Sequence, residues 1–252
     1  MDQIFPVSTP ALSDDDLVSL YSPADRSHPL LRVNFISSLD GSATFAGLSG
    51  ELGGPADKQV FSILRRLSDV IVVGAGTIRA EGYGDIRLGR ASVAWRTAAG
   101  LPPQPTLAIV SGRLDLDPSS ALFANASVRP IVLTCSSADA DRRARLAEVA
   151  DVIECGTTTV EPARLIAALT DRGLAQMLCE GGPSLFGDLV RADAVDELCL
   201  TIAPALEGGE GARISHGAAS PELRGMTLDH VLVGDGLVDN SMMVTKYSRA
   251  RG

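Results

Sequence analysis

The sequence predicts one α/β domain, with a mixed, mostly parallel twisted sheet that is flanked by helices and closed by a C-terminal antiparallel hairpin. Continuous apolar segments, such as residues 69–74 (DVIVVG) and 106–112 (TLAIVSG), are typical of parallel strands buried on both faces. Segments with helical spacing, such as residues 55–68, alternate with these strands. Residues 223–250 instead alternate apolar and polar side chains around a Gly-Asp-Gly turn, which predicts the hairpin.

The remaining elements can be placed in chain order. Residues 1–30 are rich in Pro, Ser and Asp, and we expect an irregular N-terminal arm with one short helix after Ser13. The folded domain is expected over residues 31–250. Residues 82–105 are rich in Gly, Ala and Pro and are expected to form a long surface loop. Further strands are expected at 31–38, 129–134, 151–155, 175–182 and 195–204, and further helices at 138–147, 162–170 and 183–191.

Composition and charge argue against several classes of function. A net charge of -9 over 252 residues disfavours nucleic acid as a partner, because binding to the phosphate backbone needs a basic face. No stretch approaches the ~20 apolar residues of a membrane span, and we see no secretory signal. The cysteines are scattered along apolar segments, so we expect buried free thiols and a reducing cytoplasm. No metal is expected, because no ligand spacing joins His28, His216 and His230.

A glycine turn follows the apolar strand 69–74 and is the first candidate for a ligand site. Gly74, Ala75, Gly76 and Thr77 lead from this strand into a helix, where the backbone can approach a ligand closely. This is not the dinucleotide fingerprint, because its third glycine would fall at Arg79. A plain strand-to-helix turn remains the alternative.

A second glycine turn, C-E-G-G-P-S-L at residues 179–185, resembles an anion cradle. Gly181 and Gly182 would leave room for a pyrophosphate, and Pro183 occupies the first helical position. The alternative is an ordinary helix start. Because that needs one cap residue rather than two glycines, the pattern favours a ligand site.

A third turn, Ser111-Gly112-Arg113, follows the strand 106–112. An arginine at this strand end could stack on adenine or pair with a 2′-phosphate, although a solvated loop arginine is an equal alternative. All three turns follow apolar strands. Because ligands bind at the carboxyl edge of open α/β sheets, we expect the turns to converge on one extended ligand.

Polar residues also end the strand 31–38. Asn34, Ser37, Ser38 and Asp40 lie in the segment N-F-I-S-S-L-D-G. Asp-Gly is a common turn pair, so a turn role is the default for Asp40. Alternatively, Asp40 could protonate a substrate nitrogen if partial burial raises its pKa.

Taken together, these motifs resemble the reductase domain of bacterial riboflavin-biosynthesis deaminase–reductases, and especially the free-standing actinobacterial members of that family. Their order and spacing agree over residues 30–247. The resemblance implies that residues 31–250 form a reductase domain with a dihydrofolate-reductase-like fold, which is a homodimer and uses NADPH as hydride donor. The zinc deaminase half of that family has no counterpart here.

The resemblance also implies roles for individual residues. Asp40 becomes the first choice for proton donor. We expect its replacement by asparagine to lower turnover and to leave the affinity for NADPH nearly unchanged. Implied substrate contacts are Asn34, Ser37, Asp40, Lys58, Tyr83 and Arg87. Implied cofactor contacts are Ser38, Leu39, Gly74, Ala75, Gly76, Thr77, Ser111, Gly112, Arg113, Glu180, Gly181, Gly182, Pro183, Ser184 and Leu185.

Several departures from the family fall in the substrate half. Glu51 stands in the segment where the bifunctional enzymes carry a tryptophan, and residues 80–87 (AEGYGDIR) keep only an acid and Arg87 of an Asp-x-Pro-x-Leu-type stretch. Lys58 occupies the place of the basic residue that serves substrate phosphate. The expected substrate is 5-amino-6-(5-phosphoribosylamino)uracil or the related diaminopyrimidinone. The alternatives are a dihydrofolate or pterin reductase, and a non-catalytic nucleotide-binding regulatory protein.

Overall fold

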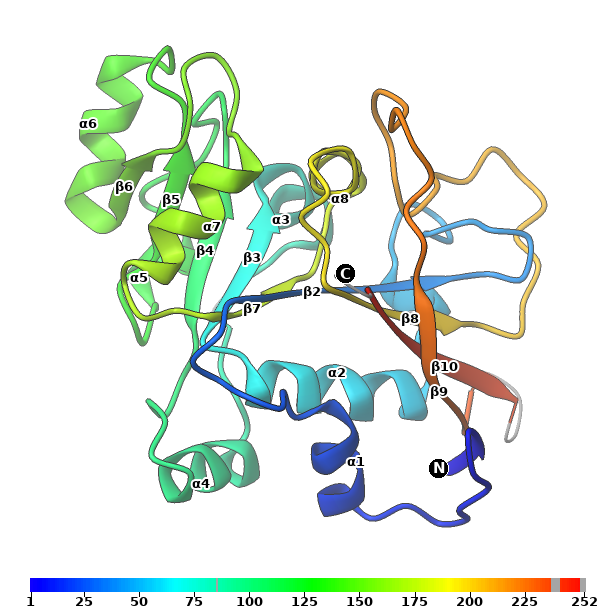
Figure 1. The fold of residues 1–252 in the computed structure, drawn as a ribbon. Coiled ribbons are helices and arrows are strands. Elements are labelled where there is room, and N and C mark those ends of the chain that lie inside the picture. Colours follow the sequence, from blue (N-terminus) through cyan, green and yellow to red (C-terminus); the bar gives the residue numbers. More distant parts are fainter. Residues whose placement is uncertain (85, 237–240, 250–252) are drawn as a thin grey trace.

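The computed structural model describes residues 1–84, 86–236 and 241–249 (Figure 1). The described residues form a ten-stranded sheet. In chain order its strands are β1 Asp2–Phe5, β2 Leu30–Ser37, β3 Val70–Gly74, β4 Thr106–Val110, β5 Ile131–Thr134, β6 Asp151–Glu154, β7 Gln176–Cys179, β8 Glu197–Ile202, β9 Thr227–Gly234 and β10 Met242–Ser248. The expected domain end at residue 250 lies outside the described residues, as does residue 85 of the segment 80–87.

The sheet has the strand order β1-β9-β10-β8-β2-β7-β3-β4-β5-β6. Neighbours from β8 through β2 and β7 to β6 pair in parallel, whereas β1, β9, β10 and β8 pair antiparallel. The C-terminal hairpin therefore lies against β8 and extends the parallel part of the sheet (Figure 1). This topology confirms the predicted fold class.

The helices lie mostly in the connections between strands, as the alternating pattern predicts. They are α1 Asp14–Tyr21, α2 Pro55–Leu67, α3 Ala75–Glu81, α4 Arg90–Ala98, α5 Ala121–Ala124, α6 Ala140–Val149, α7 Pro162–Thr170 and α8 Pro183–Arg191, with a 3-10 turn at Gly50–Leu52.

Helices cover both faces of the sheet, which explains the uninterrupted apolar strands. In β3, Val70 and Val72 pack in a cluster with α7 and α8, whereas Ile71 and Val73 pack with α3, α5 and α6 on the other face. The second face continues toward β8, β9 and β10, where α1 and α2 cover it (Figure 1).

The N-terminal segment is not the irregular arm that its composition predicts. β1 pairs antiparallel with β9 at the edge of the sheet. The Ser13 hydroxyl accepts a hydrogen bond from the Asp16 N–H at 3.1 Å, and the Asp16 carboxylate accepts one from the Ser13 N–H at 2.9 Å. This capping box starts α1 and confirms the short helix expected after Ser13. Leu17 and Tyr21 are fully buried, so the segment is part of the core.

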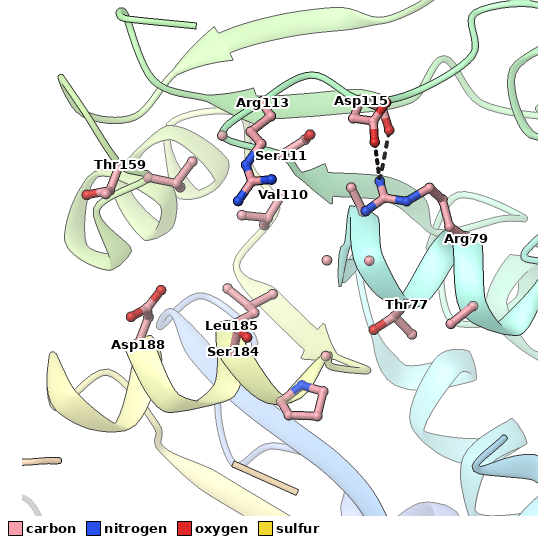
Figure 2. Close-up of a pocket in the computed structure, with 18 of the residues that line it drawn as sticks. Thr77, Arg79, Val110, Ser111, Arg113, Asp115, Thr159, Ser184, Leu185 and Asp188 are labelled. Atoms are coloured by element: carbon pink, nitrogen blue, oxygen red, sulfur yellow. Dashed lines mark hydrogen bonds and ion pairs between the residues drawn. The ribbon is translucent and has the colours of Figure 1, made fainter. Parts of the chain in front are cut away.

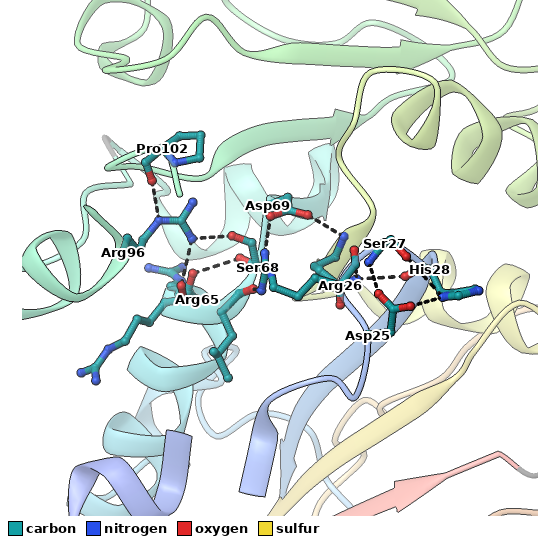
Figure 3. A network of polar contacts seen from close by, with 12 residues as sticks. Asp25, Arg26, Ser27, His28, Arg65, Ser68, Asp69, Arg96 and Pro102 are labelled. Atoms are coloured by element: carbon teal, nitrogen blue, oxygen red, sulfur yellow. Dashed lines mark hydrogen bonds and ion pairs between the residues drawn. The ribbon is translucent and has the colours of Figure 1, made fainter. Parts of the chain in front are cut away.

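The surface loop predicted over residues 82–105 is also wrong in part, because α4 forms within it. Arg96 of α4 is fully buried and donates to the carbonyl oxygens of Arg66, Ser68 and Pro102 at 2.9, 2.5 and 2.7 Å (Figure 3). Its charge thereby satisfies carbonyl groups at the C-terminal end of α2. A hydropathy pattern does not reveal such a buried arginine.

A second arginine, Arg26, anchors the segment before β2 to the C-terminal end of α2. Arg26 forms an ion pair with Asp69 and donates to the Leu67 carbonyl at 2.7 Å (Figure 3). Asp69 also accepts the backbone N–H of Gln176, whose side-chain amide donates to the carbonyl oxygens of Arg26 and His28, all at 2.9 Å. These contacts fasten the edge of the sheet where β3 and β7 begin, opposite to the glycine turns.

Two further classes of feature were sought among the described residues. No helix there combines the length and apolar character needed to cross a membrane. No group of three or more His, Cys, Asp or Glu side chains gathers there in a metal-binding arrangement.

Candidate active site

Two adjoining cavities lie at the edge of the sheet where β2, β3, β4 and β7 end. The larger has a volume of about 810 Å³ and the smaller about 290 Å³. The cavities share part of their walls, so ligands in the two would lie in contact. The shared residues are Thr44, Thr77, Glu81, Gly182 and Pro183.

The two glycine turns pack directly against each other between the cavities. The Gly74 N–H donates to the Gly181 carbonyl at 2.7 Å. A Cβ atom at Gly182 would lie 2.5 Å from the Thr77 hydroxyl oxygen, and Gly181 has a φ of +99°. The peptide bond between Gly181 and Gly182 is cis. Both glycines of this turn are therefore required by the backbone and by the close approach of Thr77.

The three turns that the sequence singles out line the larger cavity (Figure 2). They come from the ends of β3, β4 and β7, as the rule for open α/β sheets predicts. The predicted cofactor residues that line this cavity are Gly74, Ala75, Gly76, Thr77, Ser111, Gly112, Arg113, Gly182, Pro183, Ser184 and Leu185.

The backbone in this cavity is open to a ligand at two places. A Cβ atom at Gly76 would have no neighbour within 4 Å, although Gly76 lines the cavity. α8 begins at Pro183 with Gly182 as its N-cap, so no side chain caps the helix. The N–H groups of Ser184 and Leu185, in its first turn, have no acceptor within the helix. An anionic group can bind there through backbone N–H donors.

Two arginines bring positive charge to the larger cavity of this acidic chain. Arg113 points into the space between the walls and forms no ion pair with any described residue (Figure 2). Arg79 donates to the Asp115 carbonyl oxygen at 2.9 Å, and its guanidinium lies 3.7 Å from the Asp115 carboxylate. Arg113 is therefore the better placed of the two to receive a further anion.

The smaller cavity combines aromatic rings with a few polar groups. Phe35, Phe61 and Tyr83 line it. Arg65 stacks on the Phe61 ring at 4.2 Å from its centroid, which holds that ring in place. Asn34 and Lys58, two of the predicted substrate residues, complete the polar part of the lining. Such a cavity suits a flat, polar heterocycle.

Glu180 provides a buried carboxylate at the boundary of the smaller cavity. Arg65 binds it through two hydrogen bonds of 2.6 and 2.7 Å, and the Tyr83 hydroxyl donates to it at 2.9 Å. Burial and the neighbouring Glu180 charge raise the pKa of Tyr83, so its hydroxyl stays a donor. Glu180 is thereby held by two partners from different segments of the chain.

Asp57 is the site residue that the sequence did not reveal. It lies in the first turn of α2 and lines the smaller cavity. Burial raises the pKa of its carboxyl above the usual value, while a hydrogen bond with Thr201 and the charge of Lys58 oppose the rise. An acid in the first turn of a helix is common, because it complements the helix dipole, so the sequence carried no sign of a catalytic group.

Asp40 does not have the surroundings expected of a proton donor. It is exposed and lines neither of these cavities. The Ser38 hydroxyl and the N–H groups of Gly208 and Glu207 donate to its carboxylate, and these hydrogen bonds lower its pKa to about 2. An ionised carboxylate has no proton to give, so these surroundings favour a structural role for Asp40 over the predicted proton donation.

Several other predicted residues lie outside both cavities. Ser38 is buried beneath Asp40, and Leu39 is exposed. The Ser37 carbonyl accepts the Ala203 N–H at 2.8 Å, which extends the pairing of β2 with β8. Arg87, expected to bind substrate phosphate, donates to the Asn125 carbonyl oxygen at 2.9 Å instead. Gly181 supports the cavity wall through its carbonyl without lining it.

Comparison with known proteins agrees with this geometry. A family model described as the RibD C-terminal domain matches residues 29–238, most of the chain. The chain belongs to this family.

The similarity to individual members of the RibD C-terminal domain family is moderate in sequence. The 2,5-diamino-6-ribosylamino-4(3H)-pyrimidinone 5′-phosphate reductase of Methanothermobacter thermautotrophicus is 30% identical over 185 residues, which cover 73% of this chain and 82% of that protein. RibD of Mycobacterium tuberculosis is 28% identical over 183 residues, 72% of this chain but only 44% of RibD.

Solved structures show the same fold. A pyrimidine reductase-like protein of Corynebacterium diphtheriae superposes with a TM-score of 0.82 at 29% identity and covers 96% of this chain and 100% of its own. The riboflavin biosynthesis reductase Rib7 of Saccharomyces cerevisiae superposes with a TM-score of 0.63 at 20% identity, covering 91% of this chain and 93% of its own. Within this fold, the two cavities adjoin at the edge of the sheet where the parallel strands end.

Proposed function

We propose that this chain is an NADPH-dependent reductase of the riboflavin pathway, which reduces the C=N bond formed when a ribosylaminopyrimidine phosphate opens its ribose ring. The observation that carries the proposal is the pair of adjoining cavities with a shared wall. The larger suits a dinucleotide and the smaller suits a pyrimidine, so the two reactants would meet at Thr77 and Gly182. The names of the relatives support the choice of a diaminopyrimidinone.

NADPH fits the larger cavity on three grounds. The first turn of α8 offers N–H donors to the pyrophosphate of NADPH. Because Gly76 has no side chain, NADPH can approach the backbone closely there. Arg113 lines this cavity and forms no ion pair with any described residue, so its positive charge suits the 2′-phosphate. When bound, NADPH supplies the hydride for the reduction.

The pyrimidine fits the smaller cavity by shape and polarity. Phe35 and Phe61 offer apolar contacts to a flat ring, and the Asn34 side-chain amide can exchange hydrogen bonds with its polar edge. Lys58 is the only lysine or arginine among the described residues that line this cavity, and we assign it to the substrate phosphate.

Asp57 is proposed as the proton donor. Opening of the ribose ring leaves a C=N bond between the sugar carbon and the pyrimidine amino nitrogen. Hydride adds to the carbon, the π electrons move to the nitrogen, and the nitrogen takes a proton. Asp57 lines the cavity that holds the pyrimidine, and burial keeps part of its population protonated at a higher pH than an exposed aspartic acid. Thr201 holds the ionised carboxylate after the transfer.

The test is a turnover assay with purified protein. We expect loss of the NADPH absorbance band when 2,5-diamino-6-ribosylamino-4(3H)-pyrimidinone 5′-phosphate is added, with one NADPH oxidised per product. Dihydrofolate is offered separately, because Arg87 donates to the Asn125 carbonyl oxygen and Lys58 is the only lysine or arginine among the described residues of the smaller cavity. Oxidation of NADPH with dihydrofolate, but not with the pyrimidinone, would show that dihydrofolate is the substrate. Tight NADPH binding without turnover on either compound would indicate the regulatory alternative.

Arg113 provides a prediction on cofactor preference. Replacement of Arg113 by methionine keeps an unbranched apolar stem and removes the guanidinium charge that is proposed to meet the 2′-phosphate. We expect the Kd for NADPH to rise by about tenfold to a hundredfold, the range for a lost charge-assisted hydrogen bond. The Kd for NADH should stay within twofold. Equal changes for the two cofactors in a titration would remove this assignment.

We also propose that the chain forms a homodimer through the hairpin half of the sheet. On the face opposite α1 and α2, the strands β8, β9 and β10 carry half-exposed apolar side chains that join none of the core clusters. They are Leu200, Ile202, Val233 and Met243. A second copy would cover them around a twofold axis. Light scattering at micromolar concentration should give twice the chain mass of 26.2 kDa. A monomeric mass would contradict the proposal.

A further inference from the structure

Residues 205–212, in the loop after β8, contact the turn after β2 at several points. The Leu39 N–H donates to the Ala205 carbonyl at 2.9 Å, and the Ala43 N–H donates to the Ala212 carbonyl at 2.6 Å. A Cβ atom at Gly211 would fall 1.9 Å from the Ser42 hydroxyl oxygen, so the two segments touch without a gap.

Asp40 joins the turn after β2 to residues 207 and 208 of this loop. Its carboxylate accepts the N–H of Gly208 at 2.8 Å and the N–H of Glu207 at 3.1 Å, and the Ser38 hydroxyl donates to it from the other side. Because its pKa lies at about 2, the carboxylate is ionised at every pH at which the enzyme would work. Three donors thus converge on a fixed negative charge.

The contact bears on both cavities, because the segments that it joins form their walls. Thr44 lines both cavities, Ala43 lines the smaller, and Gly47 and Ala212 line the larger. These four residues follow Asp40 or Gly208 within a few positions of the chain. A change in the fit of the two segments would therefore alter the space for both reactants.

We propose that Asp40 is a positioning residue, whose carboxylate clasps the loop 205–212 onto the turn 38–44 and so fixes the wall between the cavities. The inference rests on the proposed function for its kinetic consequence, but not for the clasp itself. Asparagine is not equivalent at this position. Its amide oxygen can take the place of Oδ2 and accept the N–H groups of Glu207 and Gly208, but without a negative charge. Its NH₂ group then faces the Ser38 hydroxyl, which must change from donor to acceptor.

The first test follows the clasp directly, by amide hydrogen exchange in the absence of any ligand. In Asp40→Ala, we expect exchange at Glu207 and Gly208 to accelerate by at least about tenfold, because each N–H loses its acceptor. In Asp40→Asn the amide oxygen can still accept both N–H groups but carries no charge, so we expect a smaller acceleration. Asp117→Asn is the matched control. Asp117 is also exposed and also accepts donors from its own turn, at Ser119, but it lies in a different loop. Unchanged exchange at Glu207 and Gly208 in both Asp40 variants would overturn the clasp.

The second test separates positioning from proton donation. In Asp40→Asn we expect KM for NADPH and for the pyrimidine to rise by about fivefold to thirtyfold, from the loss of one or two charge-assisted hydrogen bonds in the wall. The value of kcat should stay within about threefold, and the pH profile should keep its shape. Unchanged KM values with a lost limb of the pH profile would assign Asp40 as the proton donor and overturn the proposal. If the wild-type protein turned over neither substrate, exchange and the Kd for NADPH would still decide on the clasp.

Discussion

Replacement of Asp57 by asparagine is expected to lower kcat by ~10²–10⁴-fold, the usual contribution of a positioned general acid. Asparagine keeps the size of the side chain and its hydrogen bond with Thr201, but it has no acidic proton. The Kd for NADPH should not change, because Asp57 lines only the smaller cavity. Stopped-flow measurement of the NADPH oxidation step would show the loss directly.

The pH dependence gives a second readout for Asp57. Because the protonated form is active, kcat should fall as pH rises through its pKa, and burial places that fall above the range of an ordinary aspartic acid. The hydrogen bond with Thr201 lowers this pKa, so Thr201→Val should move the limb to higher pH. In Asp57→Asn the limb should disappear.

A matched control is Asp141→Asn, which makes the same change in the first turn of α6, away from both cavities. It should leave kcat and its pH profile unaltered. Turnover of Asp57→Asn within a few-fold of the wild type would exclude Asp57 as the donor, and Glu81, in the wall shared by the cavities, would be tested next.

Replacement of Gly76 by valine is expected to weaken NADPH binding strongly without unfolding the chain. A Cβ atom at Gly76 meets nothing within 4 Å, so the fold accepts the side chain, but the added methyl groups enter the larger cavity. Forcing a ligand against them should raise Kd by about tenfold to a hundredfold or more. Fluorescence titration would measure the Kd, and thermal unfolding would confirm an intact fold.

Gly225→Val serves as the matched control for this change. Gly225 also has open space at its Cβ position but lies outside both cavities. The control should bind NADPH like the wild type. Normal binding by Gly76→Val would show that Gly76 is merely a turn residue and that the cofactor lies elsewhere.

Much of the fold was predictable because it follows from local pattern. The apolar run 69–74 predicts β3, and Pro183 after two glycines predicts the start of α8. The N-terminal strand β1 was missed because four residues at the edge of a sheet carry no alternation to read. α4 was missed because its environment is unusual. Its buried Arg96 binds carbonyl oxygens, whereas helix prediction relies on an apolar stripe.

The convergence of the three turns on the larger cavity was predictable for a different reason. Three turns at the carboxyl ends of parallel strands must meet at one edge of the sheet, whatever the details of packing. The proton donor depends instead on contacts between distant segments. Two N–H groups at residues 207 and 208 donate to Asp40, whereas Asp57 is partly buried beside Thr201, and on this difference we propose Asp57 as the donor. No local pattern reports either contact.

The most direct test of the central claim is to follow the hydride itself. NADPH in which deuterium replaces both hydrogens on C4 of the nicotinamide is incubated with the protein and 2,5-diamino-6-ribosylamino-4(3H)-pyrimidinone 5′-phosphate. The product is then examined by mass spectrometry and NMR. We expect one deuterium per product molecule, bound to the sugar carbon that is attached to the pyrimidine amino nitrogen. A product without deuterium, or with deuterium at another carbon, would contradict hydride transfer between the two cavities.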